Sequence, residues 1–335
     1  MSKSIIINEH GSPKVLKIVE TKIEPPGPKE IRIKNVAIGL NFIDTYHRSG
    51  LYPLKLPSGL GMEGSGIVEE IGSEVKNFSK GDNVAYASPP LGSYSDVRNI
   101  PEKIAVKIPD GITHKIAASI MTKGLTVHYL LFKTYKIKAG ETVLFHAAAG
   151  GVGQIFCQWA KNIGCKIIGT VGSDSKIDIA KENGCDFVIN YNKDSFDKKV
   201  IEITNNKGVG VVYDGVGKNT FEKSINCLKP RGMMVSFGNS SGALDPINVK
   251  KHIAAKSLFF TRPGLTHYVA ERSDLEESSS SLFEAIKFGK VKIKIFKEYA
   301  LSDAQKAHED LEGRKIIGPA LLIPNEWYKN NKSVY

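Results

Sequence analysis

The segment Thr142–Gly153 (TVLFHAAAGGVG) constrains the fold of this chain most, because it predicts a buried strand that runs straight into a glycine turn and a helix. Apolar residues at helical spacing follow the glycines as far as Gly164, a typical helix C-cap. Such a turn lets backbone N–H groups approach a pyrophosphate at a helix N-terminus, where the helix dipole favours negative charge. A GxGxxG-like match alone is weak evidence, and Ala148 replaces the first glycine. The flanking strand and helix nevertheless favour a dinucleotide site over an ordinary glycine-rich loop.

The end of the next predicted strand, Lys166–Val171, indicates which dinucleotide binds. An NAD site usually places Asp or Glu there to hold the ribose 2′-hydroxyl. This chain has Gly172, Ser173 and Lys176, which leave room, offer a hydrogen-bond donor and add a positive charge suited to a 2′-phosphate. Asp174 is the alternative ribose ligand, but it falls in the expected first turn of a helix, where a capping carboxylate is the simpler interpretation. We therefore predict NADPH as the cofactor.

Length and composition indicate one globular enzyme subunit. A chain of 335 residues suits two domains, and its 41% hydrophobic and 24% charged residues are ordinary globular values. No segment approaches the roughly 18 uninterrupted apolar residues that span a bilayer. The N-terminus has no apolar core or cleavage site of a secretion signal, so we expect a cytoplasmic protein without a membrane partner.

Neither the charge nor the cysteines indicate a further class of ligand. The net charge of +11 comes from lysines spread along the chain, whereas specific nucleic-acid binding favours a clustered basic patch. We therefore expect no nucleic-acid partner. The cysteines form no CxxC pair and no metal-site spacing, and the simplest interpretation is four buried thiols. They are Cys157, Cys165, Cys185 and Cys227.

The pattern of strands and helices divides the chain into three parts. Residues 1–122 are rich in predicted strands, with one short helix at Phe42–Arg48. Residues 123–262 alternate strand and helix, and six strands are what a complete dinucleotide fold requires. Those strands are predicted near 142–147, 166–171, 186–190, 209–213, 233–237 and 256–261. The fold class is therefore α/β.

Residues 263–335 have too little core of their own, so we expect them to fold back onto the first part. They contain predicted helices near Leu275–Phe288 and Ser302–Leu311, and predicted strands at Val291–Phe296 and Ala320–Ile323. The polar tail Asn325–Tyr335 is expected to be loosely ordered. The predicted domains are thus 1–122 plus 263–335, and 123–262.

Several motifs together resemble the quinone oxidoreductases related to zeta-crystallin, which are zinc-free medium-chain dehydrogenases/reductases. The resemblance runs from about Ile5 to Pro324, and its motifs are long and specific. It rests chiefly on Asn41–Tyr46, Lys123–Thr126, His146–Gly153, Val212–Asp214, Val235–Gly242, Thr261–Pro263 and Ala304–Glu309. The resemblance implies a GroES-like catalytic domain packed on a six-stranded parallel Rossmann domain, an active-site cleft between them, and a homodimer formed through the Rossmann sheets.

The resemblance also shows which positions of this chain would have to bind a catalytic zinc ion. Zinc alcohol dehydrogenases of this superfamily place a cysteine near the position of Asn41 and a Gly-His-Glu motif where this chain has Gly61, Met62 and Glu63. The first cysteine here is Cys157, and a methionine thioether is a poor zinc ligand. We therefore predict no metal. Without a Lewis acid, the acceptor must already be electron-poor, as a quinone is.

Five residues are our candidates for the chemistry. Asn41 and Tyr46 can hydrogen-bond an acceptor carbonyl, a water or the cofactor, and Tyr52 can stack on a flat ring. Thr126, which we place at the start of a helix-like run, matches the nicotinamide-facing threonine of the family. Asp44 either contributes to the site or holds its loop. For all five the alternative is helix capping or core packing.

The remaining cofactor contacts follow the motifs. Tyr191 matches an adenine-side position, or serves only in packing, and Arg262 reaches a phosphate or pairs with a carboxylate across the dimer. Gly215 stands where relatives often carry serine. The full set of predicted cofactor residues is Phe42, Tyr46, Thr126, Gly150, Gly151, Val152, Gly153, Gly172, Ser173, Lys176, Tyr191, Phe237, Gly238, Asn239, Ser240, Ser241 and Arg262.

The sequence is compatible with three functions. The first is an NADPH:quinone reductase in which the protein orients the nicotinamide against the acceptor in a dry cleft. The second is an NADPH-dependent reductase of α,β-unsaturated aldehydes or ketones on the same scaffold. The third is a crystallin-like or RNA-binding protein that keeps NADPH only as a ligand. The candidate cleft residues favour the enzymes, and the first is our prediction.

Overall fold

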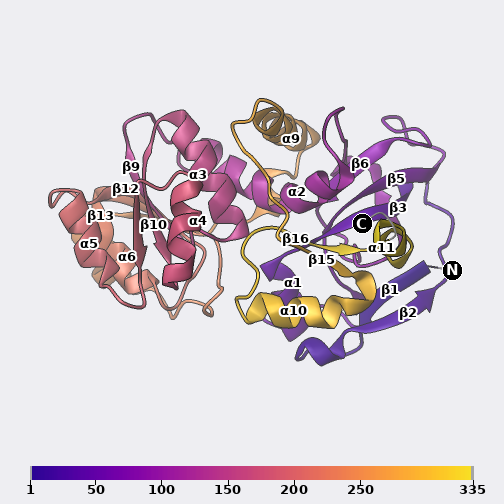
Figure 1. The fold of residues 1–335 in the computed structure, drawn as a ribbon, viewed down its shortest axis with the longest axis horizontal. Helices are drawn as coiled ribbons and strands as arrows, with labels where there is room; N and C mark the ends of the chain where they lie inside the picture. Colours follow the sequence, from indigo (N-terminus) through magenta and orange to yellow (C-terminus); the bar gives the residue numbers. More distant parts are fainter. Residues whose placement is uncertain (1, 333–335) are drawn as a thin grey trace. The chain divides into compact units, whose positions relative to one another are not determined.

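The computed structural model describes residues 2–332, which divide into two compact units (Figure 1). Unit 1 comprises Met1–Leu125, Val269–Lys287 and Ile293–Tyr335, and unit 2 comprises Thr126–Tyr268 and Phe288–Lys292. The division falls inside helix α2 (His114–Tyr129). None of the helices formed by residues 2–332 has both the length and the apolar character that crossing a membrane requires.

Unit 1 is built on a seven-stranded sheet with strand order β15-β16-β3-β5-β6-β8, and β7 also pairs with β3. In β3 (Glu30–Leu40) buried and half-buried residues alternate until the last four, which are all buried. The remaining strands are β5 (Glu63–Ile71), β6 (Asn83–Ala87), β7 (Val97–Pro101), β8 (Ala105–Lys107), β15 (Lys297–Ala300) and β16 (Ala320–Ile323). A second sheet has the order β2 (Lys17–Thr21), β1 (Ser2–Ile7) and β4 (Ser58–Gly59).

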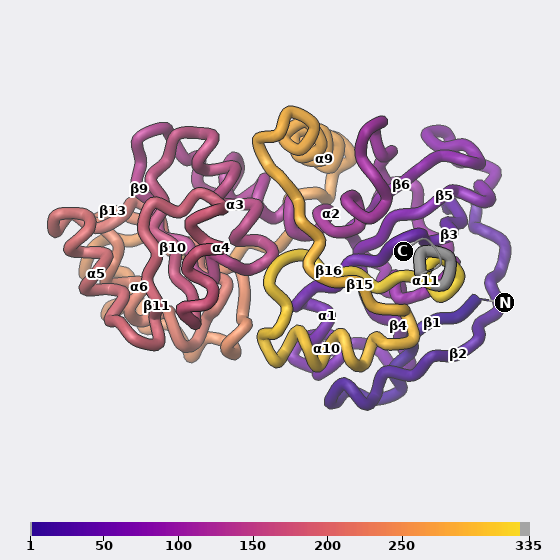
Figure 2. Tube along the Cα trace, viewed as in Figure 1, coloured from indigo at the N-terminus to yellow at the C-terminus, as the bar shows by residue number. Residues whose placement is uncertain are grey.

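The C-terminal segment completes the large sheet of unit 1. Strand β16 pairs antiparallel with β3, although the two are far apart in sequence, and Figure 2 shows them side by side. Leu322 packs with Ile38 and Leu40 in one apolar cluster. The helices of this unit are α1 (Phe42–Ser49), α9 (Arg272–Lys287), α10 (Ala304–Glu312) and α11 (Asn325–Lys332). Residues between Tyr299 and Leu322 thus contribute to the same core as β3.

Unit 2 contains six parallel strands in the order β11-β10-β9-β12-β13-β14, which confirms the predicted dinucleotide fold. The strands are β9 (Thr142–His146), β10 (Lys166–Val171), β11 (Phe187–Asn190), β12 (Val209–Asp214), β13 (Leu228–Ser236) and β14 (Phe259–Thr261). The helices are α3 (Gly151–Ile163), α4 (Ile177–Glu182), α5 (Phe196–Ile203), α6 (Phe221–Cys227), α7 (Val249–His252) and α8 (Leu265–Tyr268). The strand order reverses between β9 and β12, and ligands of such sheets bind beyond the carboxyl ends of the strands at this point.

Two predictions for the C-terminal part are wrong. Residues 291–296 form no strand, because the side chain of Gln158 hydrogen-bonds both the N–H and the carbonyl of Lys292. Gln158 Oε1 accepts from the Lys292 N–H at 2.7 Å, and Gln158 Nε2 donates to the Lys292 carbonyl at 3.1 Å. The predicted loose tail is helical over Asn325–Lys332, since Trp327 and Tyr328 pack against an apolar cluster of unit 1, and residues 333–335 of that prediction lie outside the described residues.

Helix α2 was not predicted over its whole length. Thr126 lies near its C-terminal end and not at the start of a helix. The helix is buried along most of its length, and Gly124 within it packs tightly on α9, because a Cβ atom there would lie 2.5 Å from Leu282. All four cysteines are buried free thiols, as predicted.

Candidate active site

Asn41 links β3 to α1 and is the N-cap residue of that helix. An N-cap asparagine normally uses its side chain to accept a backbone N–H of the first turn. Here the Asp44 N–H of the first turn donates to the Asn41 backbone carbonyl at 3.1 Å, and the Asp44 side chain accepts the Asn41 backbone N–H at 2.9 Å. The Asn41 side chain, in a residue only 5% exposed, is therefore available for other contacts.

Two buried charged side chains hold the Asn41 amide. Asn41 Nδ2 donates to Glu63 Oε2 at 2.5 Å, and Asn41 Oδ1 accepts from Lys123 Nζ at 2.8 Å. Glu63 begins β5 and is fully buried, and its second oxygen accepts the Thr122 backbone N–H at 2.8 Å. Lys123 Nζ also donates to the Leu40 carbonyl at 3.2 Å and lies 3.7 Å from Glu63 Oε2. The amide therefore lies within a buried ion pair, which the sequence pattern did not predict.

Asp44 is the centre of a second buried network. Its Oδ2 accepts from the Asn41 N–H and from Tyr94 Oη, the latter at 2.9 Å, and burial raises the pKa of Asp44 to about 7. Tyr94 Oη is also 3.1 Å from His308 Nε2, and Arg48 Nη1 is 3.3 Å from His308 Nδ1. Because arginine only donates, Nδ1 accepts and the Nε2–H group donates to Tyr94. Asp44 Oδ2 thus ties the start of α1 to Tyr94, which supports the interpretation of Asp44 as a residue that holds the loop, while its buried Oδ1 has no partner among the described residues.

The same network explains a neutral histidine. Burial, with the Arg48 guanidinium beside it, lowers the pKa of His308 to about 3. Arg48 is itself paired in bidentate fashion with Glu312, at 2.7 and 2.9 Å. Helix α1 is therefore fixed to α10 by a chain of hydrogen bonds from Asp44 to Glu312.

Aromatic rings gather on α1 and the loop that follows. The rings of Phe42 and Tyr46 lie 5.7 Å apart between centroids, and those of Tyr46 and Tyr52 lie 5.2 Å apart, edge to face. The Tyr52 backbone N–H donates to the Tyr46 carbonyl at 3.1 Å. The structure thus brings Asn41, Phe42, Tyr46 and Tyr52 together within one short segment of unit 1. Their functional roles stay predictions.

The glycine turn of unit 2 has the geometry that close approach of a phosphate requires. Helix α3 begins at Gly151, and its first backbone N–H groups have no partner within the helix. A Cβ atom on Gly153 would lie 2.5 Å from the carbonyl oxygens of both Ala147 and Ala148. Only glycine therefore lets α3 pack this closely on the end of β9. Gly150, Gly151, Val152 and Gly153 all lie at this helix N-terminus.

The predicted 2′-phosphate site follows β10. A Cβ atom on Gly172 would lie 2.8 Å from the Tyr191 hydroxyl, so this tyrosine covers the turn. Ser173 precedes a short helical turn, Asp174–Lys176. Asp174 does not cap a helix as expected: it accepts from Asn190 Nδ2 at 2.7 Å and forms an ion pair with Lys193 at 2.5 Å, which lowers its pKa. Its carboxylate is thus engaged by two other side chains.

Asp214, at the carboxyl end of β12, shapes the remaining loops of unit 2. Its side chain accepts the backbone N–H groups of Val216 and Gly217 at 2.8 and 2.9 Å, and its carbonyl accepts the Phe237 N–H at 2.8 Å. A Cβ atom on Gly215 would lie 2.9 Å from the Phe237 ring. The glycine thus makes room for this ring. A carboxylate directly after a buried strand was the signal that could have identified Asp214.

The other predicted residues of unit 2 lie in these loops or beside them. Ser241 Oγ donates to the Val216 carbonyl at 2.8 Å, which ties the segment from Phe237 through Gly238, Asn239 and Ser240 to the Asp214 loop. Arg262 follows β14 and donates to the Ser236 carbonyl at 2.7 Å. Thr126 is buried on α2 and hydrogen-bonds Tyr129, whose pKa burial raises.

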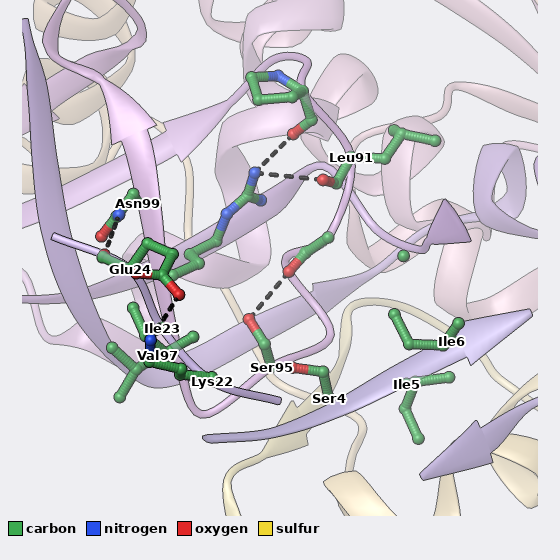
Figure 3. A pocket seen from close by; sticks show the side chains of 14 residues that line it. Ser4, Ile5, Ile6, Lys22, Ile23, Glu24, Leu91, Ser95, Val97 and Asn99 are labelled. Atoms are coloured by element: carbon green, nitrogen blue, oxygen red, sulfur yellow. Dashed lines mark hydrogen bonds and ion pairs between the residues drawn. The ribbon is translucent and has the colours of Figure 1, made fainter. Parts of the chain in front are cut away.

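A hollow of about 340 Å³ in unit 1 contains none of these residues (Figure 3). It lies between the strand that carries Ser4 and Ile5 and the loop before Ser95. The Arg98 guanidinium on its wall donates to the carbonyls of Pro90 and Leu91, at 2.7 and 3.3 Å. This arginine therefore holds the loop, and the hollow is no part of the candidate site.

Comparisons with known proteins cover both units. The family model described as "Alcohol dehydrogenase GroES-like domain" matches residues 27–110, and the one described as "Zinc-binding dehydrogenase" matches residues 151–281. The chain is 50% identical over 327 residues to quinone oxidoreductase 1 of Escherichia coli, which covers 97% of this chain and 100% of that protein. It is 42% identical over 331 residues to the 2-haloacrylate reductase of a Burkholderia species, covering 97% and 99%. The structure of Escherichia coli quinone oxidoreductase complexed with NADPH matches with a TM-score of 0.95 at 50% identity, covering 96% and 100%.

The zinc ion that the second description implies does not fit the residues present. The resemblance assigns the metal-ligand positions to Asn41 and Met62. The Asn41 amide is instead bonded to Lys123 and Glu63, and an ammonium group beside it repels a divalent cation. Across residues 2–332, no three His, Cys, Asp or Glu side chains converge as a metal site requires.

Proposed function

The chain belongs to the quinone oxidoreductases of the medium-chain dehydrogenase/reductase family, and on that premise we propose that it reduces quinones with NADPH. The observation that carries the proposal is the 50% identity to a quinone oxidoreductase along the full length of that protein. The surroundings of Asn41 support the proposal. An acceptor whose carbonyl is bound by an amide, and not polarised by a metal ion, must already be electron-poor.

In this proposal unit 2 binds the cofactor. The N-terminus of α3, at Gly150–Gly153, holds the pyrophosphate, and Ser173 and Lys176 bind the 2′-phosphate. Gly153 fits this role, because its missing side chain lets the helix N-terminus approach the end of β9. Tyr191 lies on the adenine side, and the loop from Phe237 to Ser241 receives the nicotinamide ribose. The bound NADPH supplies the reducing equivalents.

The acceptor is oriented by Asn41, by α1 and by the loop that follows α1. Asn41 donates a hydrogen bond to its carbonyl, Tyr46 hydrogen-bonds the acceptor or the cofactor, Tyr52 stacks on the acceptor ring, and Thr126 faces the nicotinamide. Asp44 and the chain of bonds to Glu312 keep α1 in place. The protein therefore contributes binding and orientation, while the cofactor contributes the redox chemistry.

A second candidate function is the reduction of an activated C=C bond. The 42% identity to a 2-haloacrylate reductase along nearly the whole of both proteins favours this alternative. A panel of quinones, alkenals, alkenones and 2-haloacrylate, with NADPH oxidation as the readout, separates the two. We expect quinones to give the largest kcat/KM. A larger value for an activated alkene would make the second function the correct one.

We further propose that the protein forms a homodimer through the edge strand β14. This strand ends the sheet of unit 2, and Phe259 on it is 59% exposed, with Val249 nearby in sequence 66% exposed. An open apolar strand edge favours pairing with another copy. Sedimentation of the wild type should give a dimer and that of Phe259→Glu a monomer. A monomeric wild type would refute this proposal without affecting the first.

A further inference from the structure

We propose that Lys123 and Glu63 form a positioning pair that fixes the Asn41 amide with an N–H group toward the acceptor, in place of a metal. This inference rests on the proposed function. It gives a role to two residues for which the sequence pattern predicted none.

The chemistry of the two partners determines the orientation of the amide. An ammonium group has only donors and an ionised carboxylate has only acceptors. The Asn41 atom 2.8 Å from Lys123 Nζ must therefore be the oxygen, and the atom 2.5 Å from Glu63 Oε2 must be the nitrogen. A flipped amide would place donor against donor and acceptor against acceptor, so only one orientation is stable.

The fixed amide keeps one donor for a ligand. An asparagine NH₂ group has two N–H bonds, of which Glu63 accepts one. Among the residues that the structure describes, none accepts the other. Capping of α1 uses acceptors, since the Asn41 backbone carbonyl accepts the Asp44 N–H at 3.1 Å, and it therefore leaves the side-chain N–H groups of Asn41 unused. Asn41 can therefore donate to an acceptor carbonyl without breaking any bond of the folded protein.

Lys123 also strengthens this donor, while Glu63 fixes its direction. Lys123 is 9% exposed at its side chain and Glu63 is fully buried, so water screens neither charge effectively. An ammonium that donates to the amide oxygen draws electron density from the nitrogen toward the oxygen, which makes the N–H hydrogens more positive and the N–H group a better donor. Negative charge develops on the acceptor oxygen as the acceptor is reduced, and a preorganised donor stabilises that charge. Lys123 acts through Asn41 and is therefore a positioning residue, not a catalytic one.

The fold accommodates this arrangement at Gly39 as well. A Cβ atom at Gly39 would overlap the Glu63 carboxylate and lie 2.5 Å from the Ala118 carbonyl. The glycine thus leaves the space that the buried carboxylate occupies between β3 and α2.

Glu63→Gln and Lys123→Met test the pair and keep the approximate size of each side chain. Lys123→Met removes the donor to the amide oxygen, and Glu63→Gln replaces one of the two acceptor oxygens that serve Asn41 and the Thr122 N–H with a donor. Lys115→Met is the matched control, since Lys115 lies on the same helix and pairs with Glu298 at 2.8 Å, away from Asn41. Wild type, N41D and these variants are labelled with [¹⁵N]Asn, and the Asn41 side-chain signals are identified by their loss in N41D. We expect one strongly deshielded Asn41 N–H in the wild type and in K115M, and its loss in E63Q and K123M.

Kinetics provide the second readout. Loss of the fixed donor should lower kcat for quinone reduction by about ten- to a hundredfold in E63Q and K123M, less than the loss of a complete oxyanion donor. The Kd for NADPH should stay within about twofold of the wild type in all three variants, because none of these residues belongs to the predicted cofactor site.

The outcomes separate this inference from the proposed function. A wild type that reduces neither quinones nor activated alkenes overturns the function, and the NMR experiment still tests the orientation. An ordinary Asn41 signal in the wild type, or unchanged kcat in both variants, overturns the inference. If K123M does not fold, the wild-type spectrum and E63Q decide the question.

Discussion

The substitution Gly153→Ala should damage both the fold of unit 2 and the binding of NADPH. The new Cβ atom would lie 2.5 Å from two carbonyl oxygens, those of Ala147 and Ala148, and both belong to backbone that cannot rotate away. Relief requires that the start of α3 move away from the end of β9 by roughly 0.5 Å or more, and overpacking of this kind costs about 1–3 kcal/mol. The same movement shifts the N–H groups that we expect to bind the pyrophosphate. Loss of a charge-assisted hydrogen bond of about 1.5 kcal/mol would weaken NADPH binding roughly tenfold.

Gly150→Ala and Gly264→Ala are the matched controls. At Gly150 the Cβ atom would lie 3.2 Å from the Ala147 carbonyl, and the backbone φ of −78° suits alanine. This variant should lose less stability than G153A, because the Ala147 carbonyl must move by only a few tenths of an ångström, but it should bind NADPH more weakly, because the methyl group hinders approach of the pyrophosphate. At Gly264 the nearest atom is 3.8 Å away, so neither property should change.

Urea denaturation measures the free energy of unfolding, and fluorescence titration measures the Kd for NADPH. The reasoning is refuted if G153A matches the wild type in both the free energy of unfolding and the Kd for NADPH, since the close packing of α3 on the end of β9 would then have no consequence. A loss of stability in G150A as large as that in G153A would refute the separate roles of the two glycines.

Three further predictions concern the cofactor, the buried network and the metal. Lys176→Ala with Ser173→Ala should raise the KM for NADPH about five- to a hundredfold and leave that for NADH nearly unchanged; equal losses with both cofactors would mean that the pair supports only the fold. Burial raises the pKa of Asp44 from 3.8 to about 7, so between these pH values the carboxyl stays protonated in the folded state and ionises in the unfolded state. The free energy of unfolding of the wild type therefore falls by on the order of 4 kcal/mol as the pH rises from about 4 to about 7. Asp44→Asn should therefore gain stability relative to the wild type across that range in urea titrations, and a constant difference would contradict the raised pKa. Elemental analysis should find zinc well below one atom per chain, and a chelator should not change activity; stoichiometric zinc lost together with activity would disprove the prediction.

The Rossmann part was predictable because its signals are local. Each central strand is a short apolar run, and the turn before α3 concentrates glycines at fixed spacing after β9. The same local argument failed at Val291–Phe296, where apolar residues alternate with lysines but the backbone of Lys292 bonds to a side chain of α3. Alternation alone does not show where the backbone hydrogen bonds go.

The candidate site was predictable only in part, since its polar contacts join distant segments. Asn41, Tyr46 and Tyr52 share one motif, and the structure brings their segment together on α1 and the loop after it. Glu63 and Lys123 belong to a strand and a helix that meet only after folding. A buried charge needs a partner, but the sequence does not indicate which residue provides it.

The central claim is that this chain reduces quinones with NADPH and without a metal ion. Its most direct test is the kcat/KM for one quinone, measured with NADPH and with NADH on chelator-treated protein of known zinc content. The account predicts turnover with NADPH, a clear preference over NADH, and no gain when zinc is added. Activity that requires added zinc, or a preference for NADH, would contradict it.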